Sequence, residues 1–89
     1  MYKVIYTHKA IEDLKKIESS IAERIINKIA FYASQENPLD FAKRLQGNYE
    51  AMYRFRIGDF RAVFWVDRDG RFSILNILKI KHRKDVYGL

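Results

Sequence analysis

The feature that most constrains the fold is a pair of alternating segments, residues 53–57 and 60–66, joined by Gly58 and Asp59. Two such segments separated by a two-residue, glycine-containing turn are typical of a tight β-hairpin. Pairing Ile57 with Phe60 sets the register, because successive side chains along a strand point to opposite faces. One face of the hairpin then consists of Tyr53, Phe55, Ile57, Phe60, Ala62, Phe64 and Val66. We expect this apolar face to form part of the core.

The opposite face of the predicted hairpin is basic. Arg56 lies opposite Arg61 in this register, and Arg54 lies two residues further along the strand. Like charges directly across a strand pair destabilise a sheet, so stability alone does not explain this arrangement. We interpret the three arginines as a binding site for an anionic group. The alternative is a solvated face on which they form ion pairs with the hairpin and turn acids, Asp59, Asp67 and Asp69.

The first forty residues predict a strand followed by two helices. Alternation over residues 2–6 indicates the strand, and Thr7 can cap the first helix, on which Asp13 is expected on the polar face. Ser19-Ser20 can cap the second helix. Its apolar stripe is expected to contain Ile21, Ile25, Ile29 and Tyr32, widened by Ile26, Ala30 and Ala33.

The second half of the chain predicts a connector and three strands. The connector covers residues 39–47, with Phe41, Ala42 and Leu45 as its anchors, and the strands cover about 49–57, 60–67 and 71–80. A three-residue turn over 68–70 would place Phe72, Ile74, Asn76 and Leu78 on the core face of the sheet. It would place Ser73, Leu75, Ile77 and Lys79 on the arginine face. The order β-α-α-β-β-β predicts one α+β domain over residues 1–89, an antiparallel twisted sheet with a helical hairpin on one face.

The charge of the chain is distributed unevenly. Residues 1–42 contain six basic and six acidic residues, whereas residues 43–89 contain eleven basic and five acidic ones, which accounts for the whole net charge of +6. Such asymmetry suggests a directional anionic partner, either nucleic acid or an acidic protein segment, and a generically basic, soluble surface explains the charge equally well. The chain has no cysteine and hence neither disulfides nor thiolate metal sites. It has no apolar run of signal-peptide or membrane-span length, so we expect a cytoplasmic protein without a membrane partner.

The C-terminal segment adds chemistry to the basic end of the sheet. It reads Lys-Ile-Lys-His-Arg-Lys-Asp-Val-Tyr over residues 79–87, so that His82, Arg83 and Tyr87 are expected to converge on the three arginines. Together with the Arg-Ile-Gly-Asp-Phe-Arg hairpin over residues 56–61, this segment closely resembles the RelE/ParE toxin superfamily. Within that superfamily the pattern is most similar to the RelE branch.

This resemblance implies a RelE-like fold and a toxin of a type II toxin–antitoxin system. It implies a ribosome-dependent endonuclease that cuts mRNA without a metal ion or cofactor, by attack of a ribose 2′-hydroxyl on the adjacent phosphate. The implied partners are a cognate RelB-like antitoxin, the ribosome and mRNA. Promoter DNA is implied only as a partner of the toxin–antitoxin complex.

The resemblance also assigns roles to individual residues. Arg61 and Arg83, at matching family positions, would stabilise the negative charge that develops on the phosphorane. Tyr87 would stack on or orient a base. The remaining candidates for binding RNA phosphates are Arg54, Arg56, Lys79 and Lys81.

The general base is not identified by the resemblance, because Arg54 and Arg56 stand where the best-known members carry lysines. Arginine does not deprotonate in proteins. His82 is the candidate acid or base, since its ordinary pKa lies near neutrality. Glu50 is a weaker candidate, and a third alternative is that the ribosome supplies the proton transfer.

Two other functions remain open at this point. The chain could be a ParE-type toxin that inhibits DNA gyrase without enzymatic activity, or an inactive RNA- or protein-binding module. The non-functional interpretation of His82 is an ordinary surface histidine. For Tyr87 it is a residue that closes the C-terminal edge of the core. The outer face of the sheet also carries apolar residues, which suggests a binding surface: Met52, Val63, Trp65, Leu75 and Ile77.

Overall fold

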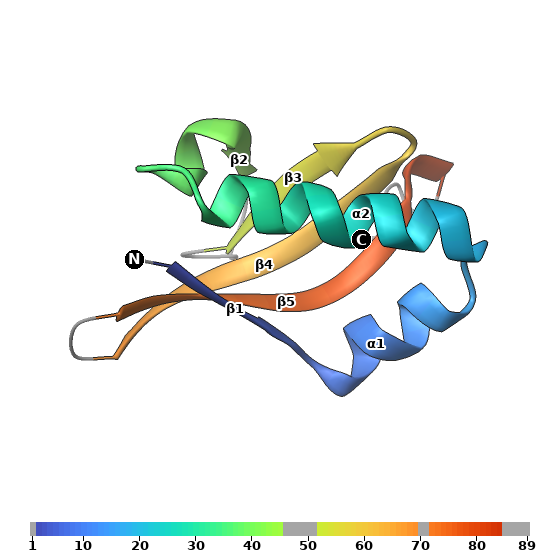
Figure 1. Cartoon of the computed structure of the whole chain (residues 1–89), viewed down its shortest axis with the longest axis horizontal. Helices are drawn as coiled ribbons and strands as arrows, with labels where there is room; N and C mark the ends of the chain where they lie inside the picture. Colours follow the sequence, from blue (N-terminus) through green and yellow to red (C-terminus); the bar gives the residue numbers. More distant parts are fainter. Residues whose placement is uncertain (1, 46–51, 70–71, 85–89) are drawn as a thin grey trace.

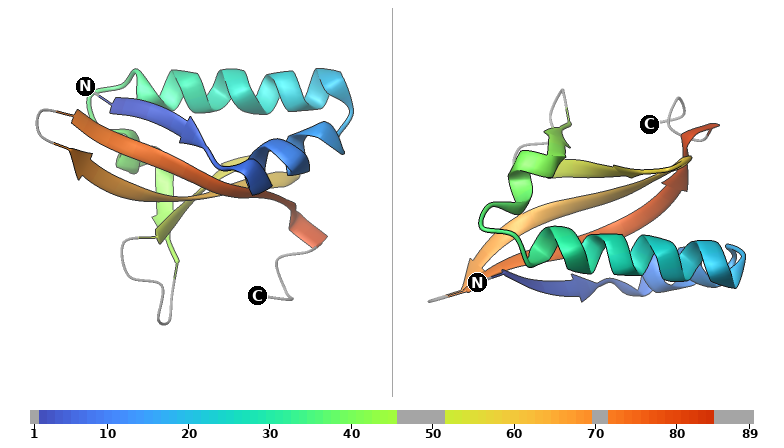
Figure 2. Two further views of the ribbon diagram at one scale, coloured as in Figure 1. Left: turned by 90° about the horizontal axis from the view of Figure 1, so that it is seen from below. Right: turned by 45° about the horizontal axis from the view of Figure 1, so that its top comes forward.

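The computed structural model describes residues 2–45, 52–69 and 72–84. Two helices lie on one face of a five-stranded sheet, which confirms the expected α+β class (Figure 1; Figure 2 gives two further views). In chain order the elements are β1 (Tyr2–Tyr6), α1 (His8–Lys15), α2 (Ser19–Ala33), the 3₁₀ helix η1 (Pro38–Phe41), β2 (Ala42–Arg44), β3 (Met52–Ile57), β4 (Phe60–Asp69) and β5 (Phe72–His82). No helix of these ranges is long and apolar enough to cross a membrane.

The sheet is mixed, with the strand order β1-β5-β4-β3-β2. The expected antiparallel pairing holds for β2 to β5, but β1 runs parallel to β5. A parallel neighbour requires a crossover connection, and α1 and α2 belong to the connection that leads from β1 to the rest of the sheet. The predicted connector contains η1 and an additional short strand, β2, which forms the edge of the sheet beside β3.

The β3–β4 hairpin has the predicted register. Ile57 pairs with Phe60, and Arg56 pairs with Arg61. Gly58 has φ +59°, in the left-handed region that favours glycine. Phe55 and Phe64 are 0% exposed and their stacked rings lie 4.3 Å apart, so the apolar face of the hairpin is the centre of the core.

The predicted faces of β5 are wrong for residues 72–77, whereas Lys79 pairs with Val63 and lies on the arginine face as predicted. Asp69 pairs with Phe72, so the β4–β5 connection is one residue shorter than expected, and its two residues lie outside the described ranges. Since the side-chain period of a strand is two residues, this change reverses the faces. Leu75 and Ile77, expected on the arginine face, are 0% exposed in the core, and Asn76 pairs with Trp65 on the outer face.

A β-bulge in β5 changes the faces a second time. Phe64 pairs with Ile77, but its neighbour Val63 pairs with Lys79, which leaves Leu78 as an extra residue. Beyond the bulge Ile80 pairs with Ala62 and is buried in the core. The spacing from Ile77 to Ile80 is therefore three residues instead of two.

Two side chains, one from the N-cap of α1 and one from the helix itself, bind β5 at and just beyond the bulge. Thr7 caps α1 as predicted, accepting from Ala10 N at 3.1 Å, and its hydroxyl also donates to Leu78 O at 2.8 Å. Asp13 was expected on the polar face of α1, but it is buried and its Oδ2 accepts from Ile80 N at 3.0 Å. Lys9 forms an ion pair with its other oxygen. The carboxylate thus satisfies a buried backbone donor in β5.

Helix α2 packs its apolar stripe on the sheet, with two differences from the prediction. Glu18 is the N-cap residue and makes no side-chain capping bond, whereas Ser19 and Ser20 lie in the first turn of the helix. The buried positions are Ala22, Ile25, Ile29 and Tyr32, while Ile26 and Ala30 are exposed. The stripe is therefore narrower than expected and follows the i, i+3, i+4 spacing.

We predict that Asp13→Ala lowers the free energy of unfolding by about 1–3 kcal/mol, because the buried Ile80 N–H loses its acceptor. Asp13→Asn keeps a side-chain oxygen at this position and should lose less. Urea unfolding measures both. Glu12→Ala, one residue away on α1 and partly exposed, is the control and should change stability by less than about 0.5 kcal/mol. Equal losses for Asp13→Ala and Glu12→Ala would contradict the assigned role of Asp13.

We predict that Gly58→Ala destabilises the protein by about 1–2 kcal/mol, because φ +59° is unfavourable for a residue with a Cβ atom. A Cβ added here meets no atom within 4 Å, so the cost is conformational and not steric crowding. Gly58→Asn should cost less, since asparagine tolerates this region. Thermal unfolding of the three proteins tests the order Gly, Asn, Ala.

Candidate anion-binding groove

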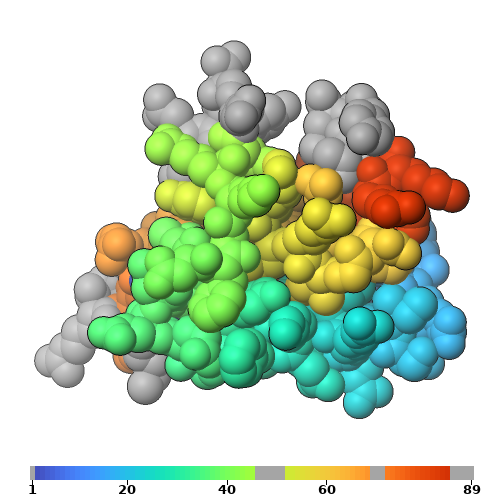
Figure 3. All heavy atoms as spheres, turned by 90° about the horizontal axis from the view of Figure 1, so that it is seen from above, coloured from blue at the N-terminus to red at the C-terminus, as the bar shows by residue number. Residues whose placement is uncertain are grey.

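A groove of about 210 Å³ lies at the end of the sheet formed by β2, β3 and β4. Its lining residues are Phe41, Lys43, Arg54, Arg56 and Arg61. Four of these five side chains are cationic and none is acidic. In Figure 3 the atoms of η1 and β2 (green) lie against those of β3 (yellow), above α2. The groove therefore brings together the three arginines predicted from the sequence and two residues from the connector.

Strand register explains why these cations meet. Lys43 pairs with Arg54 across β2 and β3, and Arg56 pairs with Arg61 across β3 and β4. Side chains on paired residues share a face, and this face is opposite to that of Phe55, which packs in the core. Val63 lies between Arg54 and Lys79 in the same row and is only 2% exposed, although it is not part of the main core. Long basic side chains cover apolar surface with their aliphatic stems in this way.

The arginines repel one another and are partly desolvated. Burial lowers the pKa of Arg54 from its ordinary value, and the positive charges of Arg61 and Arg56 lower it further. The Nε atom of Arg61 is buried and has no hydrogen-bond partner among the described residues. A buried donor without a partner is costly, and an anion bound in the groove would supply the missing negative charge.

The alternative, a face neutralised by nearby acids, is not what the described residues show. Asp59 forms its ion pair with Arg83, with 3.9 Å between Oδ1 and Nε, and both side chains are exposed. Asp67 accepts from the backbone N of Arg68. None of the ion pairs in the described ranges involves a groove arginine.

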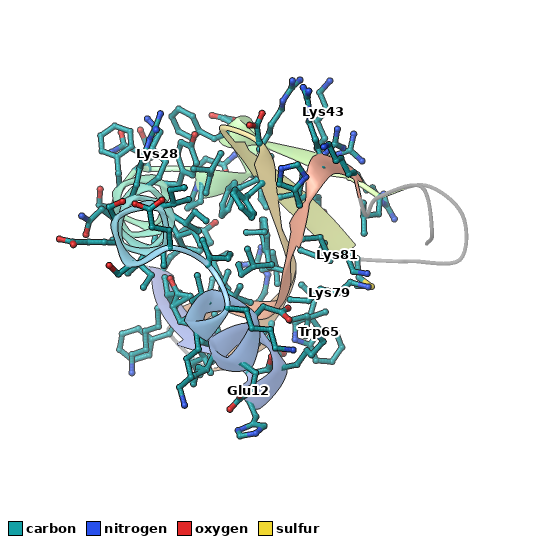
Figure 4. All side chains as sticks on the ribbon, turned by 90° about the vertical axis from the view of Figure 1, so that its right-hand side faces the viewer. Glu12, Lys28, Lys43, Trp65, Lys79 and Lys81 are labelled. Atoms are coloured by element: carbon teal, nitrogen blue, oxygen red, sulfur yellow. The ribbon has the colours of Figure 1, made fainter. Side chains whose placement is uncertain are left out.

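Lys79 and Lys81 extend the basic face along β5. Lys81 pairs directly with Arg61, and Lys79 pairs with Val63. In Figure 4 both lysines project from the side of the sheet away from α2, as does Trp65. Burial lowers the pKa of Lys79, as do the charges of Lys81 and Lys9, while Asp13 acts in the opposite direction. The expectation that these lysines lie near Arg61 holds for Lys81 in particular.

His82 and Arg83 do not enter the groove. Since Lys81 pairs with Arg61, the next residue, His82, pairs with Phe60 and belongs to the opposite face; its ring meets Phe60 edge-on at 5.1 Å. Its Nδ1 accepts from Lys84 N at 3.2 Å. The backbone N of Arg83 donates to Asp59 O at 2.7 Å, which places Arg83 beside the hairpin turn. The expected convergence of His82 on the arginines was wrong, whereas Tyr87 and Glu50 lie outside the described residues.

The groove suits a phosphate group better than it suits proton transfer. Guanidinium groups present forked donors that match phosphate oxygens and stay charged at neutral pH. Among the described residues, neither a histidine nor a carboxylate lines the groove. In the described part of the chain, no three histidine or carboxylate residues group together as metal ligands would. The arrangement can bind, orient and polarise an anion.

Sequence reasoning missed two groove residues. Phe41 was expected only as an anchor of the connector, and Lys43 received no role. The short edge strand β2 brings both beside β3, and a three-residue strand gives a weak sequence signal. The alternation of Ala42 and Lys43 was the one clue, because Ala42 pairs with the core residue Phe55.

The outer face also carries a small apolar patch. Trp65 is 46% exposed and pairs with the half-buried Met52. Leu75 and Ile77 do not belong to this patch, as described above. The patch is therefore smaller than the sequence suggested.

Comparison with known proteins identifies the family. The family described as the ParE toxin of the type II toxin–antitoxin system parDE matches residues 4–87. No curated protein matches the chain. Among solved structures, the toxin–antitoxin complex RelBE2 from Mycobacterium tuberculosis is similar with a TM-score of 0.72 and 26% identity, over 92% of this chain and 98% of that one.

Two further solved structures show the same fold. The RelB–RelE antitoxin–toxin complex from Methanococcus jannaschii has a TM-score of 0.68 and 26% identity, over 93% of this chain and 94% of the other. The chromosomal ParDE system of P. aeruginosa has a TM-score of 0.70 and 18% identity, over 92% and 96%. Since the family match covers nearly the whole sequence, the chain belongs to the ParE toxin family of the RelE/ParE superfamily and is a toxin of a type II toxin–antitoxin system.

Proposed function

We propose that this toxin is an endoribonuclease that cleaves mRNA on the ribosome. The observation that carries the proposal is the groove in which Arg54, Arg56 and Arg61 converge with Lys43, with no acidic side chain among its described lining residues. A stable sheet does not require such a cluster, whereas a scissile phosphate with its flanking nucleotides does. The two similar structures with 26% identity are complexes that contain RelE-type toxins, which adds support.

In the proposed reaction the groove binds the scissile phosphate. The 2′-oxygen of the preceding ribose forms a bond to phosphorus, and the bond from phosphorus to the 5′-oxygen of the next nucleotide breaks. The products are a 2′,3′-cyclic phosphate and a 5′-hydroxyl end. Arg61, which lines the groove, would donate through its guanidinium group to a phosphoryl oxygen as negative charge develops on it. Arg54 and Arg56 would hold the substrate in line for the attack.

The proton of the 2′-hydroxyl requires an acceptor, and the leaving 5′-oxygen requires a donor. Arginine is unsuited to accept a proton, and the register directs His82 away from the groove. We assign the proton transfers to groups that the ribosome contributes, which also accounts for ribosome dependence. Tyr87 keeps its proposed role as a base-stacking residue, and Arg83 a proposed role in binding phosphate from beside the hairpin turn.

The proposed partners follow from the same assignment. We expect a RelB-like antitoxin that blocks the basic face, since two of the similar structures are complexes of RelE-type toxins with antitoxins. Acidic and amphipathic segments suit a surface on which cations lie beside exposed aromatic residues. The ribosome requirement places the activity in the cytoplasm, and promoter DNA would be bound only through the antitoxin complex.

We predict that Arg61→Ala reduces cleavage of a translated message at least about a hundredfold, because one such contact to a charged transition state is worth roughly 3 kcal/mol. Primer extension on the message measures the cuts. Arg61→Lys keeps the charge but loses the forked donor and should recover only part of the activity. Arg24→Ala, an exposed arginine on α2 outside the groove, is the control. Wild-type cleavage by a folded Arg61→Ala protein would refute the site.

Inhibition of DNA gyrase is the second candidate function, because the matching family description names ParE toxins. If the endonuclease assignment is right, equimolar toxin leaves the supercoiling activity of purified gyrase unchanged. Supercoiling of relaxed plasmid, with and without the cognate antitoxin, measures this. Inhibition that the antitoxin reverses would replace the endonuclease assignment with the gyrase one.

A further inference from the structure

We infer that Phe41 is a stacking platform for a nucleobase next to the phosphate-binding groove, so that the RNA passes over the β2 edge of the sheet. This inference deepens the proposed function and rests on it. It assigns a specific role to a residue that the family resemblance did not single out.

Phe41 ends a row of aromatic rings that begins in the core, and its own contact in this row is a stacked one. The ring of Phe55 lies 4.7 Å from that of Tyr32, which in turn lies 4.9 Å from Phe41 at an interplanar angle of 22°. Phe55 and Tyr32 are buried, whereas Phe41 is 45% exposed. One face of the Phe41 ring is therefore held by Tyr32, and the ring remains largely exposed. A ring fixed in this way loses little conformational freedom when a base stacks on it.

The same residue lies at the rim of the groove. Phe41 is the last residue of η1 and directly precedes β2, whose Lys43 pairs with Arg54. It lines the groove together with Lys43, Arg54, Arg56 and Arg61. The neighbouring Asp40 is not among the lining residues of the groove, and its carboxylate accepts from the side chain of Asn37 at 3.3 Å. An aromatic ring and four cations thus share one concave site.

Further aromatic and basic side chains continue this surface onto α2. Phe31 is 50% exposed and meets Phe41 edge-on, with 6.4 Å between ring centroids. The Nζ atom of Lys28 lies 5.3 Å from the Phe31 ring. Phe31 and Phe41 thus form an exposed aromatic surface with Lys28 at one end and Lys43 at the other.

Single-stranded RNA fits this combination better than an acidic peptide does. Each nucleotide offers both a phosphate and a flat aromatic base, whereas acidic side chains match only the cations. Proteins that bind single strands combine a basic groove with aromatic platforms in this manner. The positive charge of the second half of the chain, eleven basic against five acidic residues, provides the long-range attraction.

The test measures binding of a non-cleavable 2′-O-methyl oligonucleotide of five adenosines by fluorescence anisotropy, with five further oligonucleotides that each lack one base. Phe41→Leu keeps apolar packing on Tyr32 but removes the aromatic face, and should weaken binding of the intact oligonucleotide about tenfold. One of the five base-lacking oligonucleotides lacks the base that stacks on Phe41. Wild type and Phe41→Leu should bind that oligonucleotide equally. Phe41→Tyr should restore the affinity. Ile26→Ala, an exposed apolar position on α2 outside the groove, is the control.

Unchanged affinity of Phe41→Leu for the intact oligonucleotide would overturn the inference. So would an equal loss for all six oligonucleotides, because the effect would then not depend on a base. If Phe41→Leu weakened only the binding of the cognate antitoxin, Phe41 would be a protein contact and the inference would be wrong. Base-dependent loss of binding supports the inference even if the wild-type protein cleaves no message, an outcome that would remove the proposed endonuclease alone.

Discussion

The bulge at Leu78 is the feature on which the two faces of the sheet depend. Before it, Leu75 and Ile77 point into the core; after it, Ile80 does so, and Lys81 joins Arg61 on the outer face. Without the extra residue, the strand period would bury the lysines and expose Ile80. Two hydrogen bonds hold this geometry: Thr7 donates to the carbonyl of the bulge residue Leu78, and Asp13 accepts from the backbone N of Ile80, two residues beyond it. A buried carboxylate on α1 therefore helps to keep the cationic face in register.

The core makes the repulsion among the arginines tolerable. Like charges opposite each other in a sheet cost about 0.2–1 kcal/mol per pair, whereas full burial of a phenylalanine contributes about 1.5–3 kcal/mol. Phe55 and Phe64 are fully buried on the other face of the same hairpin. The hairpin can thus present Arg54, Arg56 and Arg61 together and remain folded. The buried Arg61 Nε, which has no hydrogen-bond partner among the described residues, is a second cost.

Local sequence signals predicted the hairpin but not the contacts that cross the fold. The glycine turn and strict alternation were sufficient for the register of β3 and β4, because a two-residue turn leaves one pairing. The faces of β5 depended on the length of the next turn and on a bulge, and an error of one residue reversed them. Asp13 was assigned to the polar face of its helix because its partner, the backbone N of Ile80, is 67 residues away and gives no local signal. The three arginines of the groove were predictable, whereas Phe41 and Lys43 depended on a short edge strand.

The residues of the groove bear separately on phosphate binding and on proton transfer, which the shared fold does not distinguish. The similar structures include both RelE- and ParE-type toxins, so the fold by itself does not choose between RNA cleavage and gyrase inhibition. A cluster of guanidinium groups suits a phosphate group in either case. What distinguishes a nuclease is a route for the proton, and among the described residues the groove has neither a histidine nor a carboxylate, with His82 directed elsewhere. Under the proposed endonuclease function, the ribosome that presents the message is the natural source of a proton acceptor.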